Sequence, residues 1–173
     1  YLKRIKAGQS IKENGPTWHM SKQGTPTMGG LMFIAAIAVV CLSVGFECMA
    51  EGEYGHLFCL AFALVFGAIG FLDDYEKLKK KQNLGLTAGK KMLLQLAAAV
   101  AFIFLMRRFG YVALDSLYIP FWNKTVPISE PLYVIFAAFV IVGTVNSVNL
   151  TDGVDGLAAS TTMPVCIFFA VIS

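Results

Sequence analysis

Long apolar runs, separated by polar links, constrain the fold of this chain more than any other feature. A transmembrane helix needs about 20 predominantly apolar residues, because the hydrocarbon core of a bilayer is about 30 Å thick. Five runs are predicted to span a membrane, over residues 28–46, 57–72, 92–106, 131–148 and 157–173. We therefore predict an all-α, polytopic transmembrane protein.

The composition excludes an ordinary soluble domain. Of the 173 residues, 57% are hydrophobic and only 14% are charged, and the mean hydropathy is +0.66. The four cysteines lie in or beside apolar runs without metal-ligand spacing, so we interpret them as small hydrophobic residues. The chain begins Tyr-Leu-Lys-Arg and ends inside an apolar run. We expect residues 1–173 to form a single integral-membrane domain that is incomplete, as a piece of a longer protein.

The basic residues predict the orientation of the chain. Five spans place the links 1–27, 73–91 and 149–156 on one side of the membrane, and these links hold eleven of the fourteen Lys and Arg residues. Cytoplasmic links carry an excess of basic residues, so this side is predicted to face the cytoplasm. The three most unusual polar motifs of the sequence then all lie on the cytoplasmic face.

Two adjacent carboxylates, Asp73 and Asp74, directly follow the second apolar run, and Lys77 comes one turn later. A carboxylate at the centre of a membrane helix costs about 2.5–3.5 kcal/mol, and two neighbouring carboxylates also repel each other. A chain that keeps such a pair at a membrane boundary is expected to use it. With lysines nearby, the pair suits Mg²⁺ and phosphate chemistry. The alternative is a solvated helix end whose lysines only set the topology.

A motif rich in glycine and threonine, from His19 to Gly30, precedes the first span. Its backbone N–H groups and hydroxyls, including that of Thr27, suit an anion cradle near a helix N-terminus, and Lys22 adds positive charge. The alternative is a membrane-entry turn whose glycines allow close helix packing. The motif by itself does not decide between the two.

The third motif places polar residues at every third position before the fifth span. Its members are Asn146, Asn149, Asp152 and Asp155. In a helical segment this spacing brings the four side chains close together. Four such residues at a membrane boundary favour a functional site, although Asp155 also suits the N-cap of the fifth span.

Together these motifs resemble the polyprenyl-phosphate N-acetylhexosamine-1-phosphate transferases, a family of membrane enzymes. The resemblance rests on four runs in the same order, namely SKQGTPTMGG at 21–30, FLDDYEK at 71–77, NLGLTAGKK at 83–91 and GTVNSVNLTDGVDGLA at 143–158. Each run lies at a predicted cytoplasmic boundary. The GTPTMGG form resembles the branch of the family that transfers phospho-N-acetylmuramoyl-pentapeptide (phospho-MurNAc-pentapeptide).

The resemblance implies a Mg²⁺-dependent transferase. Enzymes of this branch move phospho-MurNAc-pentapeptide from UDP-MurNAc-pentapeptide to undecaprenyl phosphate, which releases UMP and forms lipid I for peptidoglycan synthesis. Carried over to this sequence, the resemblance implies that Asp73 and Asp74 act in catalysis, and they are also candidates for Mg²⁺ binding. The residues implied in substrate binding are Lys22, Thr27, Lys77, Lys91, Asn146, Asn149, Asp152 and Asp155.

The resemblance also implies a protein of the bacterial cytoplasmic membrane with about ten spans and a cytoplasmic active face. One span before Tyr1 and about four after Ser173 are then expected outside this chain. With them would come a third key aspartate, the family's main Mg²⁺ ligand, and a histidine-rich loop. The implied partners are the two substrates and membrane lipids, with a homodimer left open and no nucleic acid.

Two alternatives to this function remain open. A related transferase that moves GlcNAc-1-phosphate to undecaprenyl phosphate would share the chemistry. An ion-coupled transporter would also keep acids in a membrane, but it predicts acids near the middle of the bilayer and internal repeats. For the transferase, direct attack by the lipid phosphate and a covalent phospho-aspartate are both open. We favour direct attack, because the acceptor is already an anionic nucleophile.

Overall fold

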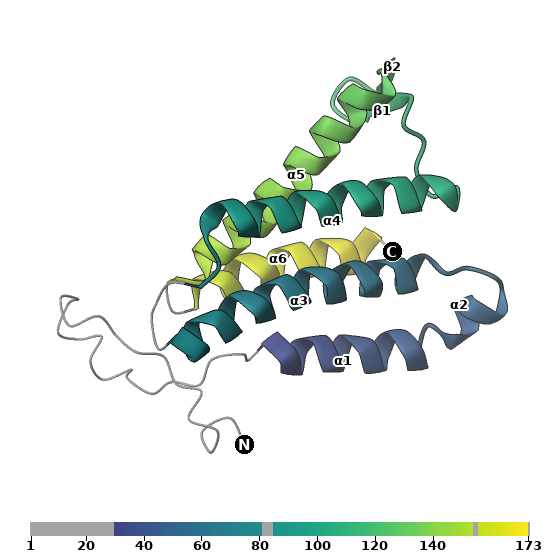
Figure 1. Cartoon of the computed structure of the whole chain (residues 1–173). Helices are drawn as coiled ribbons and strands as arrows, with labels where there is room; N and C mark the ends of the chain where they lie inside the picture. Colours follow the sequence, from purple (N-terminus) through teal and green to yellow (C-terminus); the bar gives the residue numbers. More distant parts are fainter. Residues whose placement is uncertain (1–29, 81–84, 154–155, 173) are drawn as a thin grey trace. The chain divides into compact units, whose positions relative to one another are not determined.

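The computed structural model describes residues 30–80, 85–153 and 156–172, and helices account for most of them (Figure 1). The chain divides into two compact units, residues 1–112 and 113–173. The first unit contains helices α1 (Gly30–Ser43), α2 (Phe46–Ala50), α3 (Gly55–Lys80) and α4 (Ala88–Arg108). The second unit contains strands β1 (Ser116–Ile119) and β2 (Lys124–Pro127) and helices α5 (Glu130–Thr151) and α6 (Leu157–Ile172). The predicted helical class is confirmed, with one small hairpin added.

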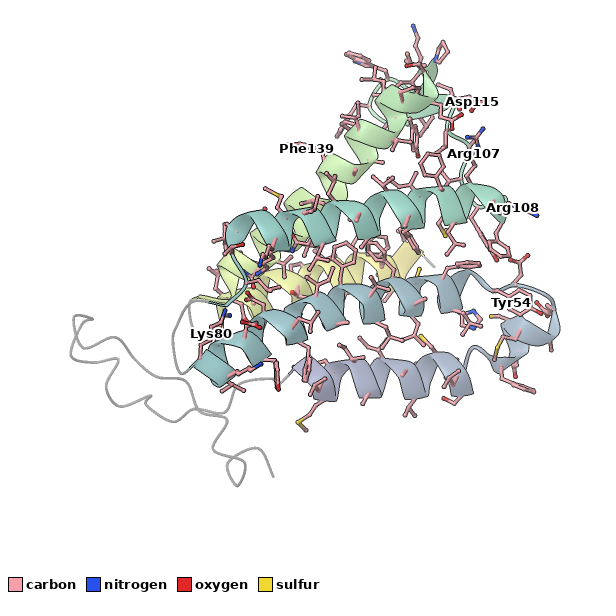
Figure 2. The ribbon with its side chains drawn as sticks, in the orientation of Figure 1. Tyr54, Lys80, Arg107, Arg108, Asp115 and Phe139 are labelled. Atoms are coloured by element: carbon pink, nitrogen blue, oxygen red, sulfur yellow. The ribbon has the colours of Figure 1, made fainter. Side chains whose placement is uncertain are left out.

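Among the described residues, three helices are long and apolar enough to cross a membrane, namely α3 with 26 residues, α4 with 21 and α5 with 22. Helices α1 and α6 are apolar but shorter. In the first unit, Lys80 and Arg108 lie at opposite ends of the α3–α4 pair, with mostly apolar side chains between them (Figure 2). These helices support a polytopic membrane protein, whereas the total of five spans and the single-domain organisation stay predictions.

Helix α3 contacts both α1 and α4 in the first unit (Figure 1). On the α4 side, the ring centroids of Phe62 and Phe102 lie 4.3 Å apart. On the α1 side, Gly67 faces Ile34, whose Cδ1 would lie only 2.6 Å from a Cβ at position 67. These contacts on two sides fix α3, the helix that carries the acid pair.

Aromatic contacts join the start of α3 to the end of α4. The ring of Phe58 lies 4.9 Å from that of Phe109 and 5.1 Å from that of Tyr111, measured between centroids. The Tyr111 hydroxyl accepts a hydrogen bond of 3.2 Å from the backbone N–H of Tyr54. The two helices therefore run antiparallel, and the end of α3 lies beside the start of α4 (Figure 1).

The second unit begins with an antiparallel hairpin where the sequence predicts only a link. Strands β1 and β2 pair with Ile119 opposite Lys124. At the turn, Asn123 has a φ of 47°, a left-handed conformation that asparagine adopts more readily than most residues. The Tyr118 hydroxyl donates a 2.7 Å hydrogen bond to Oδ1 of this asparagine. Two residues separate β2 from α5, and Pro131 lies in the first turn of α5, a position that proline favours.

Helix α3 continues beyond its predicted span. The sequence predicts a polar loop from Asp73 onward, whereas the helix ends at Lys80. Lys80 pairs with Glu76 one turn earlier, at 2.6 Å, and basic residues in the last turn interact favourably with the helix dipole. The acid pair therefore lies on a helix, which fixes the directions of its two side chains.

Candidate functional site

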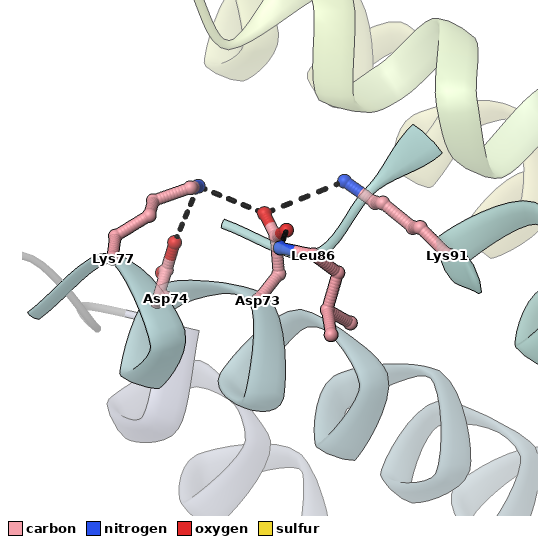
Figure 3. A network of polar contacts seen from close by, with 5 residues as sticks. All are labelled: Asp73, Asp74, Lys77, Leu86 and Lys91. Carbon is pink, nitrogen blue, oxygen red and sulfur yellow. Dashed lines mark hydrogen bonds and ion pairs between the residues drawn. The ribbon is translucent and has the colours of Figure 1, made fainter. Parts of the chain in front are cut away.

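Asp73 is a buried acid near the end of α3, and its side chain is only 11% exposed. Its Oδ2 lies 2.8 Å from Nζ of Lys77 on the same helix and 3.7 Å from Nζ of Lys91 on α4 (Figure 3). Its Oδ1 accepts a 2.9 Å hydrogen bond from the backbone N–H of Leu86. Both oxygens of this carboxylate are therefore engaged, by groups from three parts of the first unit.

Asp74 lies beside Asp73 but is more open, with its side chain 37% exposed. Lys77 donates a 2.9 Å hydrogen bond to Oδ1 of Asp74, so this lysine bridges the two carboxylates (Figure 3). The bridge relieves the repulsion between the two negative charges. Among the described residues, no other cation pairs with Asp74, and its Oδ2 takes part in no ion pair.

The ion pairs set the charge states of this cluster, which lies beyond the predicted span 57–72. Burial by itself would raise the pKa of Asp73, but the hydrogen bonds from Lys77 and Leu86 and the charge of Lys91 outweigh burial and lower that pKa below its usual value. Burial would lower the pKa of Lys77, and its two carboxylate partners raise it instead. The acid is thus held as an anion and the lysine as a cation.

The Leu86 contact is the part of this cluster that the sequence does not predict. Leu86 lies in the NLGLTAGKK run, but it contributes a backbone N–H, which a pattern of side chains does not reveal. The next residue, Thr87, is the extended N-cap of α4. The chain therefore passes the acid pair just before it turns into α4, and Lys91 reaches the same carboxylate from the first turn of that helix.

The described part of the second unit contains three of the predicted substrate-binding residues. Asn146 and Asn149 lie one turn apart on α5, and Asp152 directly follows the last residue of that helix. The side-chain amide of Asn146 donates a 2.8 Å hydrogen bond to the carbonyl of Val142, while Asn149 and Asp152 are exposed. Their proximity to the acid pair stays a prediction.

Three further predicted residues, Lys22, Thr27 and Asp155, lie outside the residues that the structure describes. The structure therefore brings together four of the predicted site residues, namely Asp73, Asp74, Lys77 and Lys91. Sequence motifs from two separate segments, FLDDYEK and NLGLTAGKK, meet in this cluster.

Comparison with known proteins identifies the family. A family profile described as Glycosyl transferase family 4 matches residues 56–173, which is more than half of the chain. The chain belongs to this family. Within glycosyl transferase family 4, a further profile points to one kind of member: phospho-N-acetylmuramoyl-pentapeptide-transferase signature 1 matches residues 22–34.

Relatives named phospho-N-acetylmuramoyl-pentapeptide-transferase extend this similarity over nearly the whole chain. The proteins from Staphylococcus carnosus (strain TM300), Staphylococcus aureus (strain bovine RF122 / ET3-1) and Staphylococcus haemolyticus (strain JCSC1435) are 42%, 44% and 44% identical to it. The matches cover 99% of this chain and 53% of each relative, so the chain spans about half the length of these relatives. The resemblance that the four sequence runs predict is confirmed.

The acids of this glycosyl transferase family 4 chain fit part of a site for a divalent metal ion. Mg²⁺ commonly binds through one or two carboxylates together with substrate phosphates. Within the part of the chain that the structure describes, one oxygen of Asp74 has no ion pair, whereas both oxygens of Asp73 are engaged. Over residues 30–80, 85–153 and 156–172, no group of three or more His, Cys, Asp or Glu could hold a metal ion. The acid pair thus fits part of a metal site that needs further ligands.

Proposed function

We propose that the full-length protein transfers phospho-MurNAc-pentapeptide from UDP-MurNAc-pentapeptide to undecaprenyl phosphate, with release of UMP and formation of lipid I. This reaction would serve peptidoglycan synthesis on the cytoplasmic face of a bacterial membrane. The name and the 42–44% identity of the relatives support the proposal. The observation that carries it is the cluster of two carboxylates and two lysines at the end of a membrane-capable helix.

The proposed chemistry joins two anions. A phosphate oxygen of the lipid acceptor attacks the β-phosphorus of the donor, and UMP leaves with the electron pair of the broken P–O bond. Catalysis of such a step relies mainly on positioning and on neutralisation of charge. An acceptor with a lipid tail keeps its phosphate at the membrane interface, and the acid pair lies where the apolar part of α3 ends.

Lys77 and Lys91 suit the task of neutralising the pyrophosphate. Both Nζ atoms lie within 3.7 Å of the same oxygen, Oδ2 of Asp73, so the two positive charges converge. Hydrogen bonds between ammonium groups and phosphate oxygens are short and strong. In the proposal, Asp73 holds the two ammonium groups close together. When the substrate binds, its phosphate oxygens compete with Asp73 for the same donors.

Asp74 is the residue best suited to hold the proposed Mg²⁺, because its Oδ2 has no ion pair among the described residues. Asp73 is the second candidate. When bound, the metal would supply further neutralisation of the pyrophosphate. The remaining ligands would come from the substrate and from the third aspartate that the family resemblance implies outside this chain.

The contacts of Asp73 favour direct attack by the lipid phosphate over a phospho-aspartate. Both oxygens of Asp73 are engaged, so a nucleophilic Asp73 would first have to break its contact with Leu86 or with a lysine. The acceptor phosphate is an anion already and needs no such step. Incubation with the donor alone, followed by mass spectrometry, tests this preference: a phosphorylated Asp73 or Asp74 would overturn it.

Release of UMP by the full-length protein tests the proposed reaction. With UDP-MurNAc-pentapeptide, undecaprenyl phosphate and Mg²⁺, UMP should appear in step with lipid I, and omission of the acceptor should abolish it. A preference for UDP-GlcNAc as donor would assign the protein to the GlcNAc-1-phosphate branch. No UMP with any donor, together with ion flux across vesicles, would replace the enzyme by a transporter.

The second unit is tested by Asp152→Asn. If this residue contacts the substrate, the release of UMP should fall by orders of magnitude while the protein stays folded. Normal release would remove Asp152 from the proposed site and leave the acid pair unaffected.

A further inference from the structure

Gly85 lies so close to Asp73 that no side chain fits between them. A Cβ atom at position 85 would meet Asp73 Oδ1, and it would lie 2.6 Å from the carbonyl oxygen and 2.8 Å from Cγ of the same residue. Contacts of Cβ atoms below 3.0 Å essentially never occur. The backbone of Gly85 is not in the left-handed region, so the glycine is needed here for space and not for its conformation.

The atoms on the other side of this contact have little freedom to move. The carbonyl oxygen belongs to the backbone of α3, and the carboxylate is held by Lys77 and Lys91. A side chain at position 85 must therefore push its own segment away from α3. That shift would stretch the hydrogen bond from Leu86 to Asp73, and it would also move Lys91, because the segment leads directly into α4 (Figure 3).

We propose that Gly85 is a positioning residue: its missing side chain lets the Leu86 amide fix the Asp73 carboxylate, which aims Lys77 and Lys91 at the substrate phosphates. The amide holds Oδ1, so Oδ2 faces both lysines. Rotation of the carboxylate would separate the two cations. The inference rests on the proposed phosphotransfer, and Gly85 acts through Asp73 without touching a reacting atom.

Gly85→Ala in the full-length protein tests this role, with Gly70→Ala as the matched control. Gly70 lies on α3, one turn before Asp74, and a Cβ there would meet nothing within 4 Å. A misplacement of about 1 Å can cost about 100-fold in rate, so we expect kcat for UMP release to fall by about 10-fold or more in Gly85→Ala. A kcat within about twofold of the Gly70→Ala value would overturn the proposal.

A double-mutant cycle with Asp73→Asn distinguishes positioning through Asp73 from a general loss of structure. Residues that act through one another are not additive, so Gly85→Ala should lower the residual kcat of Asp73→Asn by no more than about twofold. Full additivity would overturn the proposal. The melting temperature, measured without substrate, should fall on Gly85→Ala both in the parent protein and in Asp73→Asn, because asparagine keeps the atoms that a Cβ at position 85 would meet. This second readout tests the contact even if the parent protein releases no UMP, a result that would refute the proposed function instead.

A backbone change at Leu86 removes its hydrogen bond to Asp73 without adding atoms near that carboxylate. This variant tests the positioning role even if Gly85→Ala does not fold. Replacement of Leu86 by the corresponding α-hydroxy acid keeps the side chain but deletes the N–H donor. We expect kcat to fall by about 10-fold or more. An unchanged kcat would show that the Leu86 amide does not position the carboxylate.

Discussion

Replacement of each member of the acid pair by asparagine should separate two carboxylates that are neighbours in the sequence but differ in their surroundings. Asp73 is 11% exposed and receives contacts from three donors, whereas Asp74 is 37% exposed and receives one. Asparagine keeps the shape of the side chain and removes its charge. A hydrogen bond to a charged group contributes about 1.5–3 kcal/mol, and an exposed ion pair about 0.2–1 kcal/mol. Asp73→Asn should therefore lower the free energy of unfolding by about 2–3 kcal/mol, and Asp74→Asn by less than about 1 kcal/mol.

Chemical denaturation of the full-length variants in one detergent measures this difference, and UMP release from the same preparations measures activity. Turnover should fall by orders of magnitude in both variants, because the proposed reaction uses both acids. Equal losses of stability would refute the conclusion that Asp73 is the enclosed member of the pair. Near-normal turnover in both variants would refute the assignment of the site.

Four other substitutions probe further contacts. Lys77→Met should lower the kcat of UMP release more than Lys91→Met, because Lys77 contacts both acids and lies closer to the pair; a larger effect of Lys91→Met would contradict this order. Tyr111→Phe removes the hydroxyl that accepts a hydrogen bond from the Tyr54 N–H. It should lower the free energy of unfolding by about 0.5–1.5 kcal/mol and leave kcat unchanged. A large drop in kcat would show that this end of the α3–α4 pair affects the site. Ala99→Leu enlarges a side chain that has no exposed surface. It should lower the free energy of unfolding by about 1–3 kcal/mol, measured by thermal unfolding. An unchanged free energy of unfolding would contradict the close packing of α4 around Ala99.

The sequence predicts the long helices well because the physics behind them is simple. A segment that crosses lipid must satisfy its backbone groups internally, so a long apolar run implies a helix. Residues 57–72 and 92–106 accordingly lie within α3 and α4. The ends of these helices are harder to predict, because polar residues such as Asp73–Lys80 suit a loop as well as a helix. Ion pairs across one turn favour the helix here, and the apolar pattern does not report them.

The hairpin in the link 109–130 escapes prediction for a related reason. Its strands have only four residues each, and its turn lacks the Asn-Gly or Asp-Gly pair that most strongly signals a hairpin. The local signs of the turn are Pro120, which favours this position in a turn, and the left-handed Asn123. An aromatic link without such a pair is therefore compatible with either outcome.

The acid pair could be predicted because charge at a membrane boundary is costly, but the difference between its two members could not. Asp73 and Asp74 are adjacent in the sequence and look equivalent. Asp73 is enclosed by Leu86, which lies 13 residues later, and by Lys91 on the next helix. The role proposed for Gly85 depends on the same approach of two segments, which only the folded chain brings together.

Because α3 is continuous, it fixes the distance between its membrane-spanning segment and the acid pair. One helix carries both the membrane-crossing segment and the acid pair, with no joint between them. One extra residue in a helix raises everything beyond it by about 1.5 Å and turns it by about 100°. A loop would absorb such an insertion. In α3 the insertion would instead rotate Asp73 away from Leu86 and move it farther from the membrane-spanning segment. In the proposed reaction, the number of residues from Gly55 to Asp73 is therefore tied to the depth at which the lipid phosphate lies.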